Sequence, residues 1–319
     1  MRLCYIVVER LPDLCFIKKS KVMKIVVTGS LGKISKPLVQ ELIKKGHSLT
    51  VVTSKPERKG DIEALGAKAA VGTVEDPDFL TATFAGADLV YTMIPPGNFM
   101  DANYDVYARV RAMMESYRQA IVDAGIKRVV HLSSIGGHTD QGNGLLRLHY
   151  IAETTLRQLP ADLHLTFMRP VGFYTNLYGY IPMIRQQGFI AANYGGDDLA
   201  VWVAPADIAS AVAAEIEQSS GSSPVIRYVA SEELTCKDTA RILGQAIGKP
   251  DLQWIKIPDQ QMLDGLIAMG MKPDIAEGMV EMYAGRGTLY EDYSRHRPVL
   301  GKIKMADFAK EFAAAYHRQ

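Results

Sequence analysis

Short apolar runs alternate with amphipathic segments along the first 230 residues. The apolar runs predict buried strands at residues 23–27, 47–52, 68–72, 88–94, 128–132, 165–170 and 225–230. Segments whose apolar residues recur every three or four positions predict helices at 37–46, 61–65, 79–84, 104–124 and 149–159, with another after 202–209. This alternation is typical of right-handed βαβ units. We therefore expect an α/β fold with a doubly wound parallel sheet that binds its ligand at the carboxyl ends of the strands.

The pattern changes after residue 170. Residues 171–200 are rich in Tyr, Asn and Gly, and the chain beyond residue 234 is predicted to be mainly helical. We expect one domain over 23–170, completed by 201–231, and a smaller, mainly helical lobe built from 171–200 and 232–319. Residues 1–22 precede the first predicted strand, and we interpret them as an extension outside the fold.

The first predicted strand ends in a glycine-rich turn that opens directly into a helix. Gly29 permits a tight turn, and Gly32 lets the backbone approach a ligand with no side chain in the way. The start of the helix offers free N–H groups and a partial positive charge, which suit a pyrophosphate. The turn therefore predicts an NAD(P) site formed by Thr28, Gly29, Ser30, Leu31, Gly32, Lys33 and Ile34. The third small position of this motif is Ser35 rather than glycine or alanine.

The end of the second predicted strand favours NADP(H) over NAD(H). A site for NAD usually places an acidic residue there, on the 2′-hydroxyl of the ribose. The chain instead carries hydroxyls and cations, which accept a 2′-phosphate: Thr53, Ser54, Lys55 and Arg58. A solvated basic loop is the alternative interpretation of these residues.

Charge and cysteine content exclude several classes of protein. The 319 residues carry 36 Lys and Arg against 35 Asp and Glu, a net charge of +1, so we expect neither nucleic acid nor a membrane as partner. No apolar run is long enough to span a membrane. The 3 cysteines lack metal-ligand spacing, so we expect no metal and a reducing, cytoplasmic location. The predicted partner is a small molecule bound by a monomer or homodimer.

Several motifs occur in an order that identifies a family. They are residues 28–32, Gly72 to Asp76, Val129 to Ser134, His149 to Glu153, Met168 to Leu177, 202–209, and Leu234-Thr235. With these motifs the chain resembles NmrA-like members of the atypical short-chain dehydrogenase/reductases. The resemblance implies a Rossmann-type domain with a smaller, mainly helical substrate lobe. The family contains NADPH-dependent quinone reductases and also members that bind NAD(P) and regulate partners without turnover.

The resemblance also implies places for further residues. Val74 would lie by the adenine, and Met93, Ile94 and Pro95 would line the nicotinamide side, over which Pro170 closes. Residues of the lobe would face the substrate: Tyr174, Asn176 and Tyr178, with Trp202 beside the same cleft.

The pair of residues that carbonyl-reducing relatives use is missing. Those enzymes place a Tyr and, one helical turn later, a Lys, which lowers the pKa of the Tyr. The corresponding helix here carries His149 and Glu153, which lie on one helix face. His149 is a candidate proton donor or substrate ligand, with a structural histidine as the alternative. Ser133 is expected at the nicotinamide ribose or the substrate, and His138 is a candidate substrate ligand in a glycine-rich loop.

This departure bears on the reaction. Carbonyl reduction leaves a strongly basic alkoxide and needs an acid, whereas a reduced quinone is a weakly basic anion that water can protonate. The sequence therefore favours an NADPH-dependent oxidoreductase that passes a hydride to a quinone-like or conjugated carbonyl acceptor. The alternative is a non-catalytic NADP(H) sensor that regulates a partner. The missing Tyr-Lys pair also argues against a third interpretation, an isomerase or epimerase of sugar nucleotides.

Overall fold

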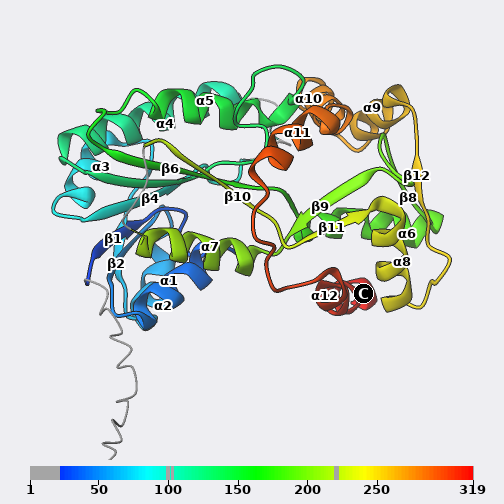
Figure 1. Cartoon of the computed structure of the whole chain (residues 1–319), viewed down its shortest axis with the longest axis horizontal. Helices are drawn as coiled ribbons and strands as arrows, with labels where there is room; N and C mark the ends of the chain where they lie inside the picture. The colour runs from blue at the N-terminus through cyan, green and yellow to red at the C-terminus, as the bar shows by residue number, and fades with distance from the viewer. Residues whose placement is uncertain (1–21, 98–100, 102–103, 219–222, 319) are drawn as a thin grey trace, which may run out of the picture.

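Seven parallel strands form the central sheet of the computed structural model, which describes residues 22–97, 101, 104–218 and 223–318 (Figure 1). Their order is β10-β6-β5-β4-β1-β2-β3, so the chain starts at the centre and winds outward in both directions. The strands are β1 (Lys24–Val27), β2 (Ser48–Thr53), β3 (Lys68–Val71), β4 (Leu89–Met93), β5 (Arg128–Leu132), β6 (His164–Pro170) and β10 (Val225–Val229). The predicted doubly wound parallel sheet is confirmed.

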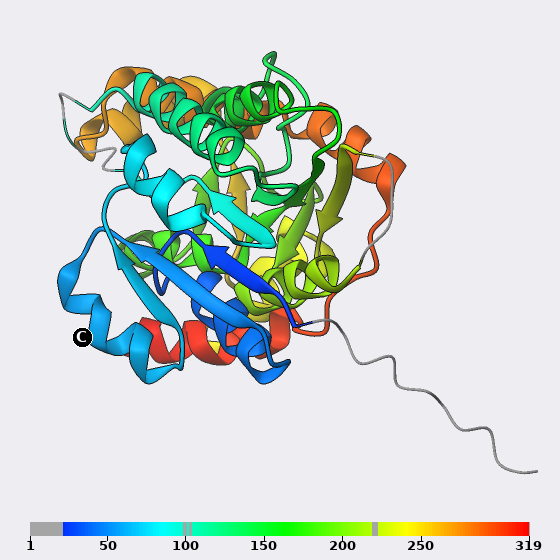
Figure 2. The ribbon, with the colours of Figure 1, turned by 90° about the vertical axis from the view of Figure 1, so that its left-hand side faces the viewer.

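Helices cover both faces of this sheet (Figure 2). One face carries α1 (Ser35–Lys44), α2 (Lys59–Ala64) and α7 (Pro205–Glu217), with the short helix η1 (Pro56–Arg58) before α2. The other carries α3 (Pro77–Phe84), α4 (Val106–Asp123) and α5 (Arg147–Leu156), with η2 (Gly144–Leu146) before α5. The strands are apolar on both sides because both faces are buried.

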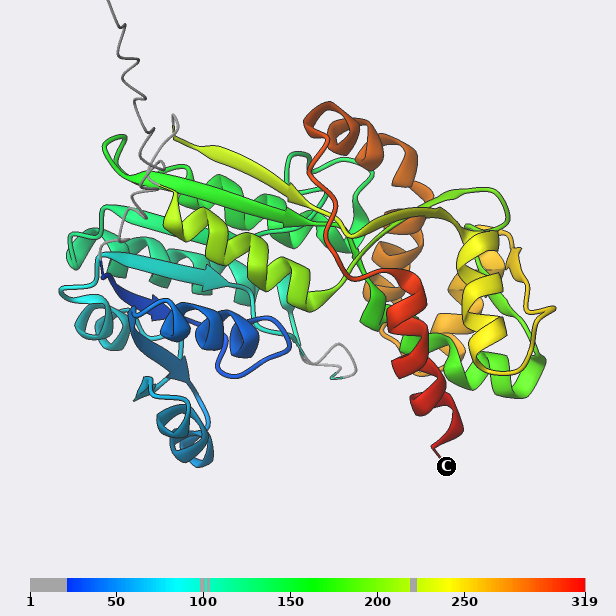
Figure 3. The same ribbon diagram turned by 60° about the horizontal axis from the view of Figure 1, so that its bottom comes forward.

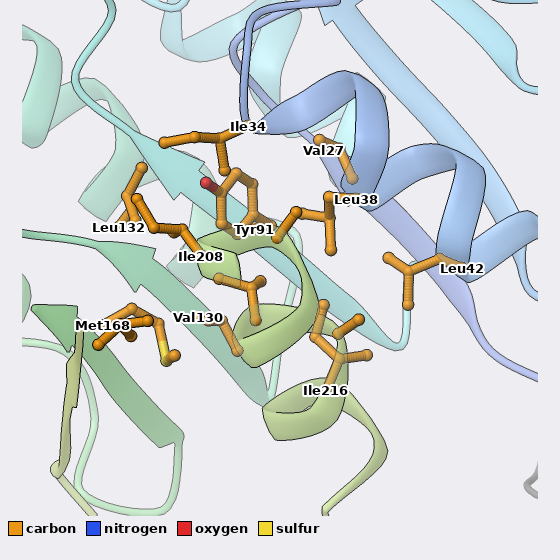
Figure 4. Packing of buried hydrophobic residues seen from close by; sticks show 14 of the residues in the cluster. Val27, Ile34, Leu38, Leu42, Tyr91, Val130, Leu132, Met168, Ile208 and Ile216 are labelled. Atoms are coloured by element: carbon orange, nitrogen blue, oxygen red, sulfur yellow. The ribbon is translucent and has the colours of Figure 1, made fainter. Parts of the chain in front are cut away.

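Apolar side chains from three layers fill the face under α1 and α7. Figure 4 shows Leu38 and Leu42 of α1 and Ile208 and Ile216 of α7 packed over Tyr91 of β4. All five side chains are fully buried. This packing fixes α1, and with it the glycine turn that precedes α1, against the carboxyl ends of the strands.

The remaining elements form a lobe beside the carboxyl ends of the strands (Figure 3). A three-stranded sheet, β11-β9-β7, and a two-stranded sheet, β12-β8, lie among the helices. The elements are β7 (Gly172–Phe173), η3 (Tyr174–Tyr180), α6 (Ile181–Gln187), β8 (Ile190–Ala192), β9 (Leu199–Val203), β11 (Glu232–Thr235), α8 (Cys236–Ala246), β12 (Trp254–Lys256), α9 (Asp259–Ala268), α10 (Pro273–Ala284), α11 (Arg286–His296) and α12 (Met305–His317). The predicted helical character beyond residue 234 is confirmed, whereas the short strands were not predicted.

Two expectations concern the ends of the elements and of the chain. Helix α1 begins at Ser35, two residues before its predicted start. The predicted N-terminal extension, residues 1–22, lies outside the described residues except for Val22. Among the described helices, none has the length and apolar character needed to cross a bilayer.

Replacing Leu38 with alanine should destabilise the protein by about 2–5 kcal/mol, because a fully buried side chain would leave a cavity between α1 and the sheet. Urea unfolding followed by circular dichroism measures this loss. Gln40→Ala, at an exposed position of the same helix, should change the free energy of unfolding by less than about 0.5 kcal/mol. Equal losses in the two variants would contradict the packing of α1 described above.

Candidate dinucleotide site

The glycine turn between β1 and α1 has a backbone that other residues rarely adopt. Gly29 has a φ of +90°, and a Cβ there would lie 2.2 Å from Sδ of Met93. Gly32 differs: a Cβ there would meet only the carbonyl oxygen of Gly29, at 3.5 Å, so the space above Gly32 is open. Gly29 is therefore required by the turn itself, whereas Gly32 leaves room for a ligand to reach the backbone.

The first turn of α1 is suited to an anion. Its N-cap residue, Ile34, makes no side-chain capping bond, and no acidic residue stands in the first turn. Lys36 already donates its N–H to the carbonyl oxygen of Gly32 at 3.0 Å and Pro37 has no N–H, so it is the positive end of the helix dipole that favours a phosphate there. Ser35 is buried and its hydroxyl donates to the carbonyl oxygen of Thr28 at 3.3 Å, so the serine in the third small position braces the turn.

The end of β2 lies next to this turn. Thr53 is buried, and its Oγ1 accepts hydrogen bonds from Oγ of Ser30 at 3.0 Å and from the backbone N–H of Lys55 at 3.2 Å. This corrects the prediction for Thr53, because its hydroxyl holds two loops together and is not exposed to a phosphate. Ser54, Lys55 and Arg58 are exposed, as a phosphate site requires.

A hollow of about 240 Å³ lies between the glycine turn, α1 and α2. Arg58 and Lys36 both line it, together with Leu31 and Asp61. The sequence interpretation missed Lys36, an exposed residue in the first turn of α1. Only the fold brings it to the same hollow as Arg58.

The residues predicted along the rest of the cofactor follow the carboxyl ends of the strands. Met93 ends β4 and Ile94 and Pro95 follow it; all three are half-buried, and Pro170, which ends β6, is buried. Val74, after β3, is half-buried against the apolar cluster of the α3–α5 face. These positions form a row along one edge of the sheet, although their contacts with a cofactor stay a prediction.

Ser133, which follows β5, is buried and its hydroxyl is already engaged. Oγ donates to Oε1 of Glu153 at 2.7 Å. Gly137 covers the pair, since a Cβ there would lie 2.4 Å from the same carboxylate oxygen. A carboxylate only accepts hydrogen bonds, so the proton of Ser133 is not free for a ligand. Ser133 could therefore only accept a hydrogen bond from the nicotinamide ribose or the substrate, and its contact with either stays a prediction.

Glu153 itself is the centre of a buried ion pair that sequence reasoning missed. Nε and Nη2 of Arg169 donate to its two oxygens at 2.8 and 2.7 Å, and Arg157 donates at 3.2 Å. Burial alone would lower the pKa of Arg169, but the hydrogen bonds and charge of Glu153 raise it. The signal was present in the sequence, because an arginine inside an apolar strand requires a buried partner.

His149 faces the sheet from the start of α5. Burial lowers its pKa from 6.5 to about 4, so the ring is neutral at pH 7. Its Nδ1 is buried without a hydrogen-bond partner among the described residues. A neutral ring at pH 7 does not favour the candidate role of His149 as a proton donor, and its hydrogen bond to a substrate or a structural role stay predictions. His131 of β5 is also buried, with its pKa lowered to about 3 by burial and by His149.

The aromatic residues predicted to face a substrate are mostly core residues of the lobe. Tyr174 is fully buried, and its hydroxyl donates to the carbonyl oxygen of Ile303 at 3.2 Å. Trp202 is buried, and its Nε1 donates to Thr239 at 3.1 Å. Both predictions are wrong, because these side chains have no surface left for a ligand.

Three other predicted substrate residues are accessible. Tyr178 is half-buried, and Nζ of Lys33 lies 5.7 Å from its ring centre, so the lobe meets the glycine turn there. Asn176 is exposed. His138 is half-buried, and its Nδ1 lies 3.6 Å from Oδ2 of Asp292 on α11. Their contact with a substrate stays a prediction.

The strand order, the glycine turn and the uncapped helix define a dinucleotide-binding α/β protein with a second lobe. The chain belongs to the NmrA-like family, which matches it over residues 21–306. The predicted membership in this family is confirmed. One curated relative is the NAD(P)H azoreductase of Xenophilus azovorans, 24% identical over 262 residues, which are 82% of this chain and 86% of that protein.

Solved structures agree with the fold. The NADPH-dependent quinone oxidoreductase of Escherichia coli complexed with NADPH has a TM-score of 0.72 at 17% identity, covering 90% of this chain and 99% of that one. The triphenylmethane reductase of Citrobacter sp. complexed with NADP(H) has a TM-score of 0.70 at 19% identity, covering 90% and 99%.

The buried histidines should make stability fall with acidity between pH 6.5 and 5. The unfolded chain takes up protons below about pH 6.5, whereas folded His131 and His149 stay neutral until about pH 3 and 4. Stability is therefore complete above pH 6.5 and decreases as pH falls, by about 1–2 kcal/mol for each histidine at pH 5. Urea unfolding at a series of pH values measures the slope.

His149→Leu should flatten this slope. His317→Gln, at an exposed position near the end of α12, should leave it unchanged. A slope in His149→Leu as steep as in the wild type would contradict the neutral buried histidine.

Proposed function

We propose that this protein is an NADPH-dependent reductase that passes a hydride to a quinone-like or conjugated carbonyl acceptor. The observation that carries the proposal is the turn at Gly29 to Gly32 with the uncapped, acid-free start of α1 behind it. The name of the azoreductase relative and the quinone oxidoreductase with the same fold support a reductase. Cytoplasmic location and a monomer or homodimer remain predictions.

In this proposal, the diphosphate lies against the open backbone at Gly32, and a 2′-phosphate lies between Lys55, Arg58 and Lys36. When bound, NADPH supplies the hydride. The residues along the ends of β4 and β6, which include Met93 and Pro170, present one apolar side to the nicotinamide and exclude water from it.

The protonation chemistry supports an acceptor that needs no acid from the protein. The Ser133 hydroxyl donates its hydrogen bond to Glu153, and His149 is neutral at pH 7. Hydride transfer to a simple ketone would form an alkoxide, and neither residue would supply the proton that the alkoxide needs. A quinone forms a stabilised hydroquinone anion, which takes its proton from water.

A sensor without turnover is the second candidate, and one observation favours it. Tyr174 and Trp202, two of the residues expected around an open acceptor cleft, fill the core of the lobe instead. A lobe whose aromatic residues are already packed suits a surface that responds to the cofactor.

The decisive experiment follows NADPH absorbance with a panel of quinones and, in parallel, simple ketones. We expect turnover of quinones only, with a kcat that changes less than about threefold between pH 6 and 8, because no group of the site has to donate a proton. Direct titration of NADPH by fluorescence runs beside the assay. Tight NADPH binding without turnover of any acceptor would favour the sensor, and a ketone turned over as fast as a quinone would contradict the proposed acceptor class.

Reversing the charge of the exposed cations after β2 should remove the preference for NADPH. In Lys55→Glu/Arg58→Glu, two carboxylates would repel the 2′-phosphate, so the Kd of NADPH should rise at least about tenfold more than that of NADH. Fluorescence titration with both cofactors measures this ratio.

A control with the same change in net charge is Lys45→Glu/Lys68→Glu. Both lysines are exposed. Lys68 is the first residue of β3, so it lies at the amino ends of the strands, away from the carboxyl ends that form the site. This pair should leave the ratio of the two Kd values unchanged. Equal weakening of NADPH and NADH in the first variant would overturn the 2′-phosphate assignment.

A further inference from the structure

Arg169 is the only described residue whose side chain joins Glu153 of α5 to Asp292 of α11. Its Nε and Nη2 bind Glu153, and its Nη1 donates to Oδ2 of Asp292 at 3.2 Å. Arg169 is 3% exposed and Glu153 1%, so their ion pair is shielded from water, whereas Asp292 is 17% exposed. One planar guanidinium therefore links a helix of the sheet domain to a helix of the C-terminal part of the chain. A lysine, with one ammonium group, does not reproduce this double fork.

The Glu153 arm supports the loop that follows β5. Ser133 donates to Glu153, and the backbone of Gly137 lies directly on both side chains, at distances that leave no room for a Cβ. The position of the carboxylate therefore sets how far residues 136–138 stand above the end of β5. His138 is the next residue of this loop.

The Asp292 arm holds α11. The hydroxyl of Tyr228 on β10 donates to Oδ2 of Asp292 at 2.5 Å, and Nδ1 of His138 lies 3.6 Å from the same oxygen. Figure 1 shows α11 on the side of the lobe that lies next to the central sheet. Both arms therefore reach His138. The Glu153 arm reaches it through the backbone of the neighbouring Gly137, and the Asp292 arm through the Asp292 carboxylate.

We propose that Arg169 is a positioning residue that fixes the 136–138 loop and helix α11 together at the acceptor end of the cofactor site. Only the expected effect on kinetics rests on the proposed function; the structural role of Arg169 does not. The glycine turn and the end of β2, which would hold the phosphates, lie outside this network. Loss of Arg169 therefore impairs use of the acceptor more than binding of NADPH.

The test compares the same substitution at two arginines that bind one carboxylate. Arg169→Lys removes the fork, whereas Arg157→Lys changes an arginine that is 42% exposed and reaches Glu153 but neither the loop nor α11. Hydrogen exchange monitored by mass spectrometry is read at residues 135–140 and 286–296. We expect Arg169→Lys to speed exchange in both segments and Arg157→Lys in neither.

Kinetics supply the second readout. In Arg169→Lys we expect kcat/KM for the quinone to fall at least about tenfold while the Kd of NADPH changes less than about threefold. A merely structural role would lower the melting temperature without this split. A loss of NADPH affinity as large as the loss of kcat/KM would overturn the proposal, as would faster exchange in only one of the two segments.

Two further variants apply if Arg169→Lys does not fold. Glu153→Gln cuts the loop arm and Asp292→Asn cuts the α11 arm, with little change in shape. Each should also loosen the far segment, because both act through Arg169, and an effect confined to the near segment would overturn the proposal. Hydrogen exchange is measured without an acceptor. An absence of quinone turnover would therefore contradict the proposed function, whereas the exchange data would still decide this inference.

Discussion

A carboxylate buried at the centre of a protein has to be paired, and the pairing of Glu153 with Arg169 organises the region where the sheet meets the lobe. Removing one partner of a buried ion pair typically costs about 3–5 kcal/mol, because the other charge is left without compensation. Here the partners come from α5 and β6, and the same guanidinium reaches Asp292 on α11. The pKa of Asp292 is lowered: burial opposes its ionisation, but Tyr228, His138 and Arg169 outweigh that effect. The guanidinium of Arg169 thus joins two consecutive elements, α5 and β6, to α11, which carries its carboxylate 123 residues after Arg169.

This pairing also explains why the site differs from that of carbonyl reductases. Where those enzymes use a lysine to assist a tyrosine, this chain has Glu153 facing an arginine. The carboxylate accepts a hydrogen bond from the Ser133 hydroxyl, and burial lowers the pKa values of the nearby histidines so that their rings are neutral. The polar groups at this end of the sheet therefore serve stability and position.

The cofactor end of the site follows a different principle. The turn at Gly29 is held from below by Met93 and Ser35, while the backbone at Gly32 stays open. The phosphate side is exposed and cationic, whereas the far end is closed by internal ion pairs. One end therefore offers open backbone and exposed cations, whereas the other is built from internal ion pairs that join the sheet to α11.

The sequence by itself determined the sheet and the glycine turn, because hydrophobic period and glycine position are local signals. Lys55 and Arg58, predicted to bind a 2′-phosphate, are exposed after β2, and that contact stays a prediction. Tertiary structure decided the rest. The sequence pattern does not distinguish whether Tyr174 and Trp202 contact a ligand or belong to the core. Only the packing of η3 and β9 against α8 and α12 buries them. Likewise the roles of Ser133, Glu153 and Arg169 depend on three segments that meet only in the folded protein. Their hydrogen bonds join residues separated by 20 and 16 positions, and such pairs leave no periodic pattern in the sequence.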